Sequence, residues 1–552
     1  MNDDEFQAAF DKELGDDGGE AGAAPINKSN MPMIQTGGGA LALNIDDAEK
    51  ALVEIGGAIF QHGDRLVEVR KGPIIASINH QATEVRGYRP VELTNMMLRD
   101  ICSRHIDFKR YDGRAKKWVS IDCPEPIAEG IRHRVGKWGF KSLAGIVSAP
   151  VIRSDGTLIS EVGYDPDTKL YVSPNDAVFP RIPEDALTRE GAIECYAYLM
   201  RPLREVKFVD EASETVAAAA ILTGLQRPML DRVPGIAIDS PVAGSGKGLV
   251  CTFASIIVLG HEASAMTAHE DARETDKVLG AKLLGGSSII LIDNVDHPLS
   301  SALLAQMMTE GALDIRVLGQ SRSVTVPNNF TVLINGNNLQ LLGDLPRRVL
   351  RCRLDPGVER PELRRFESEH PLSVARRERG KLVAAGLAIL LAYRRAGSPP
   401  QDAAPLGSFH QWSREIRDAL LWIGKPDPVS TQAAIRAVDR KRGAHEALMA
   451  KWFEVKRAAD QNVTVGLTAK RLIEVANETI KGADGFPSGY ANADLRDALM
   501  EVAAHRNGRD IDGQRLGSFL SAKVGQIVGG FRVNRSGAGQ GGLVYWVVEK
   551  VS

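Results

Sequence analysis

The sequence predicts an α/β fold in the middle of the chain, with a parallel β-sheet covered by helices. Three short apolar runs carry this prediction: GIAIDS at 235–240, SSIILIDNVD at 287–296 and NFTVLINGNN at 329–338. Continuous apolar runs are typical of parallel strands that are buried on both faces. Helical patterns such as ETVAAAAILTGLQRPML and LVCTFASIIVLG alternate with them, which favours a doubly wound sheet.

Bulk composition bounds the remaining possibilities. The chain has 552 residues, which predicts two to four domains, and its formal net charge of −2 indicates no particular class of binding partner. Five dispersed cysteines without a C-x-x-C pair argue against a zinc ribbon and fit a reducing cytoplasm. No signal peptide is visible, and LVAAGLAILLAY at 382–393 is too short to span a bilayer, so we expect a buried helix there and no membrane association.

Changes in composition along the chain predict its domain organisation. An acidic, Gly-rich start offers few groups for a core and predicts disorder. FKRYDGRAKKWVSI at 108–121 predicts two strands around a D-G turn, and APVIRSDGTLISEVGYDPDTKLYV at 149–172 predicts a β-meander. The expected parts are a disordered acidic tail at 1–45, an N-terminal α+β domain at 46–180, the α/β core at 181–370, a helical subdomain at 371–445 and a separate C-terminal domain at 446–552.

The stretch DSPVAGSGKGLV, which follows the first apolar run, resembles a phosphate-binding loop. Such a loop needs inward backbone N–H groups, a lysine for the β- and γ-phosphates, and a helix N-terminus behind it. Pro241 replaces the usual first glycine, and Gly248 replaces the Ser or Thr that normally contacts Mg²⁺. Taken alone, the loop could also be a flexible strand-to-helix connection. The residues expected to bind nucleotide are Ala243, Gly244, Ser245, Gly246, Lys247, Gly248 and Leu249.

Acidic and amide side chains close the next apolar run. Asp293 stands at its end, where a carboxylate can hold Mg²⁺ through the water shell of the ion. The next residue is Asn294, whose amide can orient water but cannot accept its proton. Asp296 is the nearest spare carboxylate. Each of these residues could instead be an ordinary turn residue.

Two further groups follow in the order expected of a nucleotide hydrolase. Asn337 and Asn338 close the third apolar run, where an amide could orient water beside the γ-phosphate. Arg347 and Arg348 follow in GDLPRRVL and could stabilise charge on the nucleotide of a neighbouring subunit. The alternatives are an Asn-rich turn and a salt-bridged helix start. Each group is weak alone, but their common order indicates an ATP site.

Together these residues resemble the superfamily-three helicases within the AAA+ ATPases, and most closely the helicase-type ATPases of phages, prophages and other mobile elements. The resemblance covers about residues 140 to 450. It implies an AAA+-type P-loop core with a helical lid. Its motifs are SAPVIRSDGTLISEVGYDP, GSGKG, LIDNVD, DIRVLGQS, INGNN, GDLPRRVL and FHQWSREIRDALLWIGKPDP.

The resemblance implies a role for each matching residue. Lys247 resembles the Walker A lysine, Asp293 the Walker B aspartate and Asn337 the sensor-1 asparagine. Asn338, the next residue, is the alternative for the sensor-1 position. Asn294 takes the place of the usual catalytic glutamate. Arg347 and Arg348 resemble the arginine finger that acts in trans, with either as the acting residue. The segment DIRVLGQSRSVTVPNN would form a hairpin that faces a central pore, where the candidate DNA contacts are Arg316, Gln320 and Arg322.

The C-terminal part has the element order of a winged helix, three helices followed by two strands around a Gly-rich turn. Basic residues outnumber acidic ones from Arg436 on, which favours contact with nucleic acid, although a protein-interaction wing is the alternative. Lys523, Arg532 and Arg535 are the expected phosphate contacts.

The resulting hypothesis is an ATP-dependent DNA helicase or translocase that uses ATP and Mg²⁺ in the replication of a mobile element. The resemblance implies a hexameric ring with one DNA strand in its pore and duplex at the winged helix. Residues 1–180 show no zinc ligands or paired catalytic acids, so priming would need a separate primase or polymerase. The alternatives are a DNA-binding initiator or regulator that ATP only assembles, and an ATPase that acts on protein in packaging or defence.

Overall fold

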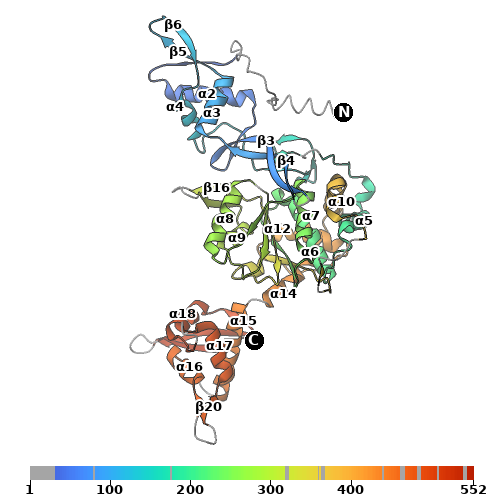
Figure 1. Ribbon diagram of the computed structural model, residues 1–552, viewed down its shortest axis with the longest axis vertical. Helices are drawn as coiled ribbons and strands as arrows, with labels where there is room; N and C mark the ends of the chain where they lie inside the picture. Colours follow the sequence, from blue (N-terminus) through green and yellow to red (C-terminus); the bar gives the residue numbers. More distant parts are fainter. Residues whose placement is uncertain are drawn as a thin grey trace. The chain divides into compact units, whose positions relative to one another are not determined.

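The computed structural model describes residues 31–78, 81–173, 177–286, 288–317, 323–358, 360–361, 367–437, 440–459, 466–481, 487–505, 509–538 and 544–551. The chain divides into two compact units (Figure 1). The first contains Met1–Leu339 and Arg348–Thr431, and the second contains Gln340–Arg347 and Gln432–Ser552.

The first unit begins with an α+β region. A sheet of order β1-β5-β6 packs on three helices, and its core includes Ile34, Leu98, Phe108 and Ile127. A second sheet of order β2-β3-β4 is formed by the chain between α2 and α3. The elements are β1 Met33–Thr36, α2 Leu41–Ile55, β2 Ile59–His62, β3 Arg65–Ile78, β4 Gln81–Glu92, α3 Asn95–His105, β5 Asp107–Asp112, β6 Lys117–Ile121 and α4 Glu125–Arg132.

The expected disordered tail is too long at its C-terminal end. β1 and the first residues of α2 lie before residue 46, because Ile34 and Ile45 are buried in the core of this region. The rest of the expected tail, residues 1–30, lies outside the described residues. The predicted strand pair around the D-G turn is confirmed as β5 and β6, where the Asp112 carboxylate accepts the backbone N–H groups of Arg114 and Ala115.

The predicted meander is confirmed only in part, because its strands form two antiparallel pairs in separate sheets and not one continuous meander. β8 pairs with β9, and β10 pairs with β11, which also lies parallel to β7. These short strands lead into the helices that pack against the central sheet. The elements are β7 Gly145–Val147, β8 Val151–Ile152, β9 Leu158–Ile159, β10 Gly163–Asp165, β11 Leu170–Val172, η1 Glu184–Leu187, α5 Arg189–Met200, η2 Arg201–Leu203, α6 Glu211–Gln226 and η3 Arg227–Met229.

The centre of the first unit is a parallel sheet of order β13-β14-β17-β12-β18. The three apolar runs form β12, β14 and β17, as predicted, and every residue of β12 is buried. Helix α7 packs with α6 and α11, and α8 packs with α9. The elements are β12 Gly235–Ser240, α7 Lys247–Leu259, β13 Ala265–Thr267, α8 Ala272–Leu284, β14 Ile289–Val295, α9 Ala302–Met307, β15 Ala312–Arg316, β16 Ser323–Pro327, β17 Thr331–Asn337 and β18 Val349–Arg353.

Helices complete the first unit. The apolar stretch at 382–393 lies in α11, where Leu382, Leu387 and Ile389 are buried, as the sequence predicts. Among the described residues no helix has both the length and the apolar character needed to cross a bilayer. The elements are α10 Pro371–Arg377, α11 Arg379–Arg395, α12 His410–Trp412, η6 Ser413–Arg417, α13 Asp418–Trp422 and η7 Pro428–Thr431.

The second unit has its own core, which includes Leu448, Trp452, Leu499 and Trp546. The three expected helices and two expected strands are present as α16, α17, α18, β22 and β23, and β21 extends the sheet. The elements are η4 Leu345–Arg347, α14 Gln432–Ala437, α15 Arg440–Ala459, α16 Ala469–Ala476, β19 Thr479–Lys481, β20 Pro487–Tyr490, α17 Ala493–Ala503, α18 Gly513–Lys523, β21 Ile527–Val528, β22 Phe531–Ala538 and β23 Val544–Lys550.

Candidate nucleotide site

The glycine loop joins the carboxyl end of β12 to the first turn of α7. Gly244 and Gly246 have φ angles of 71° and 97°, in the left-handed region that glycine adopts at little cost. Gly246 is the N-cap of α7 and offers no side chain to its unpaired N–H groups. The loop therefore presents a helix N-terminus, with its partial positive charge, at the carboxyl edge of a parallel sheet.

Lys247 lies on the inner side of this loop and is only 9% exposed. Its Nζ donates to the carbonyl oxygen of Val242 at 2.9 Å, to Ser245 Oγ at 3.1 Å and to Asn337 Oδ1 at 2.7 Å. Burial lowers the pKa of the ammonium, and the nearby Asp239 and Asp293 carboxylates partly offset this shift. A desolvated ammonium held by neutral oxygens is well placed to exchange them for phosphate oxygens.

Asp293 and Asn294 lie where β14 departs from regular pairing with β17. The register shifts between Ile292 and Val295, so these two residues form a local irregularity at the carboxyl edge of the sheet. Asn294 is exposed, has a φ of 53°, and its N–H donates to Asn335 Oδ1 at 2.9 Å. Asp293 is half-buried and close enough to raise the pKa of Lys247.

The spare carboxylate of the sequence reading, Asp296, is already engaged. Its Oδ1 lies 3.0 Å from His297 Nδ1, and this hydrogen bond lowers the pKa of the Asp296 carboxyl. Asp293 is therefore the better placed of the two acids for a metal ion beside Lys247.

The structure separates the two neighbouring asparagines. Asn337 pairs with Ser240 in the parallel register of β17 and β12, and its side chain contacts the Lys247 ammonium. Asn338 is exposed, has a φ of 48°, and its Oδ1 accepts a long hydrogen bond of 3.5 Å from Arg353 Nη2. Of the two, Asn337 is the one that reaches Lys247.

A buried charge cluster beneath the loop escaped the sequence analysis. Asp239 is fully buried and accepts hydrogen bonds from Arg351 Nε at 2.7 Å and Arg353 Nη1 at 2.6 Å. Its other oxygen accepts the N–H of Leu339 at 3.0 Å. The cluster ties β12, β18 and the turn after Asn337 together. The signal was present in VLRCR, where arginine recurs at every second position of a strand that is otherwise apolar.

Asn335 is a second residue that the sequence analysis missed. It is 3% exposed and its Oδ1 holds the backbone of Asn294, so it fixes the bulge that carries Asp293. An amide in the middle of an apolar strand was its only signal in the sequence.

The two candidate arginines have different surroundings. Arg347 belongs to the second unit, and its exposed guanidinium forms a double hydrogen bond with Asp344, with both distances 2.8 Å. Arg348 belongs to the first unit, where its Nη1 donates to the carbonyl of Ala305 and to Thr309 Oγ1. The Arg348 carbonyl accepts the N–H of Gly235, the first residue of β12. Arg348 therefore lies at the amino edge of the sheet, a strand length of roughly 17 Å from the glycine loop of its own chain.

The candidate DNA contacts are only partly described. Arg316 is exposed at the end of β15, opposite Ser323 in a hairpin whose Leu313 and Val324 face inward. Gln320 and Arg322 lie outside the described residues.

In the second unit, the three residues expected to contact phosphate differ in exposure and in whether they already have an ion-pair partner. Lys523 ends α18, Arg532 forms an ion pair with Glu549 at 3.3 Å, and Arg535 is exposed with its guanidinium 5.3 Å from the centre of the Trp546 ring. Arg535 is therefore freer than Arg532 to meet a phosphate.

The residues around the loop fit a magnesium–nucleotide complex. Mg²⁺ in such sites is held by one or two carboxylates and by the phosphates and water. Asp293 would supply one carboxylate, and no group of three or more His, Cys, Asp or Glu side chains within the described ranges forms an all-protein metal site. Gly248 replaces the Ser or Thr ligand of the usual loop. A Cβ added to Gly248 would have no heavy atom within 4 Å.

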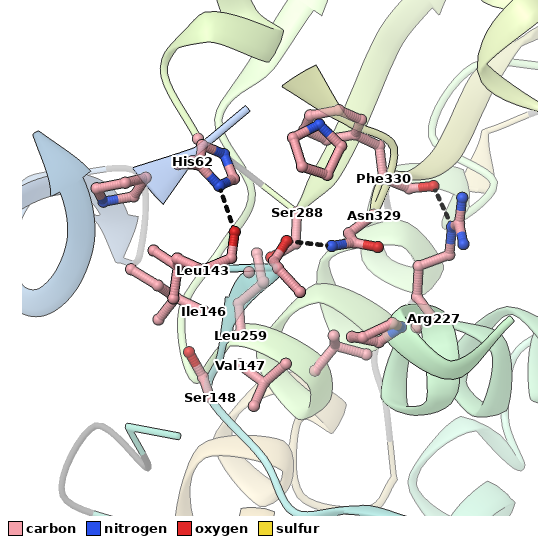
Figure 2. Close-up of a pocket in the computed structure, with 18 of the residues that line it drawn as sticks. His62, Leu143, Ile146, Val147, Ser148, Arg227, Leu259, Ser288, Asn329 and Phe330 are labelled. Carbon is pink, nitrogen blue, oxygen red and sulfur yellow. Dashed lines mark hydrogen bonds between the residues drawn. The ribbon is translucent and has the colours of Figure 1, made fainter. Parts of the chain in front are cut away.

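A small cavity of about 70 Å³ lies elsewhere in the first unit (Figure 2). It is lined by Ser288 and Phe330, which precede β14 and β17, and therefore lies at the amino edge of the sheet. His62 Nδ1 lies 2.9 Å from the carbonyl of Leu143, and Arg227 Nε donates to the carbonyl of Phe330 at 2.8 Å (Figure 2). This cavity is separate from the glycine loop at the carboxyl edge.

The comparisons with known proteins give only distant likenesses. No family model and no curated protein matches the chain. Similar solved structures include the C-terminal region of NrS-1 at 13% identity and a TM-score of 0.35, covering 91% of this chain and 98% of that one. The SCCmec type IV Cch helicase has 12% identity and a TM-score of 0.34, covering 90% and 98%. The JCV helicase has 13% identity and a TM-score of 0.20, covering 43% and 68%. At such TM-scores none of them defines the fold of this chain.

Proposed function

We propose that the protein is an ATP-dependent DNA helicase or translocase that acts as a hexameric ring in the replication of a phage or mobile element. The observation that carries the proposal is the contact of 2.7 Å between Lys247 Nζ and Asn337 Oδ1 at the end of a glycine loop. It brings a desolvated ammonium, a helix N-terminus and a polar strand end to one edge of a parallel sheet. Phosphoryl transfer depends mainly on such positioning and on stabilisation of charge.

In the proposed reaction, the loop N–H groups and Lys247 bind the phosphates of ATP. Asp293 would hold Mg²⁺ through its water shell, and the ion would neutralise charge on the phosphate oxygens. Asn337 would leave Lys247 when phosphate binds and would then be free to orient the attacking water. Asn294 offers an amide rather than a carboxylate, so we expect water to be positioned more than it is deprotonated.

We assign the charge that completes the site from a neighbouring subunit to Arg347. Its guanidinium is exposed and its only partner in the described part of the chain is Asp344, three residues away. Arg348 instead supports α9 through Ala305 and Thr309. An exposed ion pair is weak, so Arg347 can leave Asp344 for a phosphate at little cost.

The proposed DNA contacts lie at two places. The hairpin of β15 and β16 would follow one strand in the pore through Arg316, with Gln320 and Arg322 as further contacts. The second unit would act as a winged-helix module and bind duplex phosphates through Lys523, Arg532 and Arg535. A separate primase or polymerase would supply primers.

Strand displacement tests the proposal directly. A forked duplex is mixed with the purified protein, ATP and Mg²⁺, beside Lys247→Ala and a control, Lys277→Ala, that removes an exposed lysine from α8. We expect loss of unwinding and ATP hydrolysis in the first variant and neither loss in the control. Equal unwinding by Lys247→Ala would refute the proposal. ATP-driven assembly of the unaltered protein on DNA without phosphate release would instead favour the assembled initiator.

A further inference from the structure

The β5–β6 hairpin of the first unit carries an exposed surface that the proposed ATPase does not use. We call residues 109–118, KRYDGRAKKW, the basic hairpin. Its residues lie on an antiparallel pair at one side of the sheet β1-β5-β6, with β6 as the edge strand. The side chains that are exposed are those of Arg110, Tyr111, Arg114, Lys116, Lys117 and Trp118.

Two aromatic side chains form the outer face of the basic hairpin. Tyr111 and Trp118 are directly opposite each other across the two strands, and their ring centres are 5.7 Å apart at 67°. They remain 51% and 42% exposed, although Trp in particular is highly buried on average. The opposite face holds Phe108, which is fully buried in the domain core. The core therefore does not require the two exposed rings.

Basic residues flank these rings along both strands and in the turn, although Arg110 and Lys117 alternate with the rings and start from the other face of the strand pair. The basic hairpin has five basic residues and one acid, Asp112, whose carboxylate is occupied by the backbone of the turn. Lys109 pairs with Asp107 at 3.4 Å. The remaining four basic side chains form no ion pair with any part of the chain that the structure describes; they are Arg110, Arg114, Lys116 and Lys117.

Lysines on an edge strand can have a purely protective role, because they prevent the edge strands of two molecules from pairing. That role accounts for Lys117 on β6. It does not account for Trp118 beside it, because an exposed indole on an edge strand favours association. The combination of exposed rings with an excess of positive charge fits a partner that is both flat and anionic.

We propose that the basic hairpin binds single-stranded DNA, with bases stacked on Tyr111 and Trp118 and phosphates bound by the surrounding Arg and Lys side chains. Unpaired bases offer their faces for stacking, whereas the bases of a duplex are already stacked on one another. That the strand is DNA rests on the proposed function, while the stacking and the charge contacts do not. The basic hairpin would hold the strand independently of nucleotide.

Binding of a fluorescein-labelled oligothymidylate to the full chain tests this proposal. Fluorescence anisotropy is measured without nucleotide, so that the result does not depend on ATP hydrolysis. Trp118→Ala should weaken binding about tenfold, and Trp118→Phe, which keeps a ring, should recover most of it. The double variant Arg114→Gln and Lys117→Gln should lower the slope of log affinity against log salt by about 1.4.

Matched controls separate these effects from damage to the fold. Lys50→Gln removes one positive charge, half the change of the double variant, at an exposed site on α2 of the same region and should leave the slope unchanged. All substituted side chains are exposed, so the thermal unfolding midpoints should stay within a degree or two of the unaltered protein.

Three results would overturn the proposal. The first is equal affinity of Trp118→Ala and Trp118→Phe, and the second is an unchanged salt slope in the double variant. The third is tighter binding to a blunt duplex of the same length, or to phosphatidylserine vesicles, by a route that needs Trp118. If strand displacement fails, the basic hairpin proposal still stands, because it is tested without ATP. If the anisotropy test fails, the ATPase proposal still stands.

Discussion

Replacing Gly248 by serine tests the unusual feature of the glycine loop. Gly248 is the second residue of α7, and its φ lies outside the left-handed region. A Cβ added there meets no heavy atom within 4 Å. Serine therefore fits without moving its neighbours, and its hydroxyl would take the place of the Mg²⁺ ligand that the usual loop supplies.

The size of the effect follows from two separate contributions. Serine favours a helix over glycine by about 0.5 kcal/mol, so the variant should be slightly more stable. Residues that only support metal ligands change metal affinity by about tenfold or more, and a direct ligand should do at least as much. We therefore expect the Mg²⁺ concentration at half-maximal ATP hydrolysis to fall at least about tenfold.

Gly248→Ala is the matched control, because it adds the same Cβ and favours the helix by about 1 kcal/mol without adding an oxygen. ATP hydrolysis is followed by phosphate release at fixed ATP while total Mg²⁺ is varied. Superimposable Mg²⁺ curves for the Ser and Ala variants would refute this account of the loop. Loss of folding in both would show that the position is more crowded than described.

Three further predictions concern the same site. Asp239→Asn leaves Arg351 buried without its anion and should destabilise the first unit by about 3 kcal/mol. The unfolding midpoint of the first unit should therefore fall, and an unchanged midpoint would contradict the charge cluster. Because burial lowers the pKa of Lys247, affinity for a non-hydrolysable ATP analogue should begin to fall at a pH below about 10.4, the ordinary value for lysine. For the unliganded protein the sign is opposite: the unfolded chain holds this proton more tightly, so the stability contribution of Lys247 rises as pH increases through that window, and Lys247→Met should remove this dependence. Arg347→Ala should lose ATP hydrolysis with little change in stability and regain part of it when mixed with Lys247→Ala, whereas Arg348→Ala should mainly lower the unfolding midpoint; no recovery on mixing would argue against action in trans.

The strands and the glycine loop could be read from sequence because each depends on local pattern. Burial on both faces demands a continuous apolar run, and the left-handed turns demand glycine at 244 and 246. The order of the strands could not be read in this way. Insertion of β17 between β12 and β14 depends on pairing between residues about a hundred positions apart, and no local pattern records it.

The same limit explains the residues that were missed. Asp239 meets Arg353 only because β12 and β18 pair in one particular parallel register. A shift of one residue likewise decides between Asn337, which reaches Lys247, and Asn338, which turns away with a positive φ. Helix α2 begins before residue 46, inside the expected tail, because Ile45 is buried against the rest of its region. Polar residues on both sides of Ile45 gave no sign of this burial in the sequence.

The division of the chain into units has a consequence for how the protein is made. The segment Gln340–Arg347 belongs with residues that are synthesised much later, and Gln432 Nε2 donates to the Arg347 carbonyl at 3.0 Å. A chain leaving the ribosome can therefore complete its own glycine loop before α14 exists to support Arg347. In the proposed ring, a nascent chain should therefore bind nucleotide before its Arg347 can complete the site of a neighbouring subunit, and ring assembly should wait until α14 has been made. A truncation before residue 432 should reproduce that early stage.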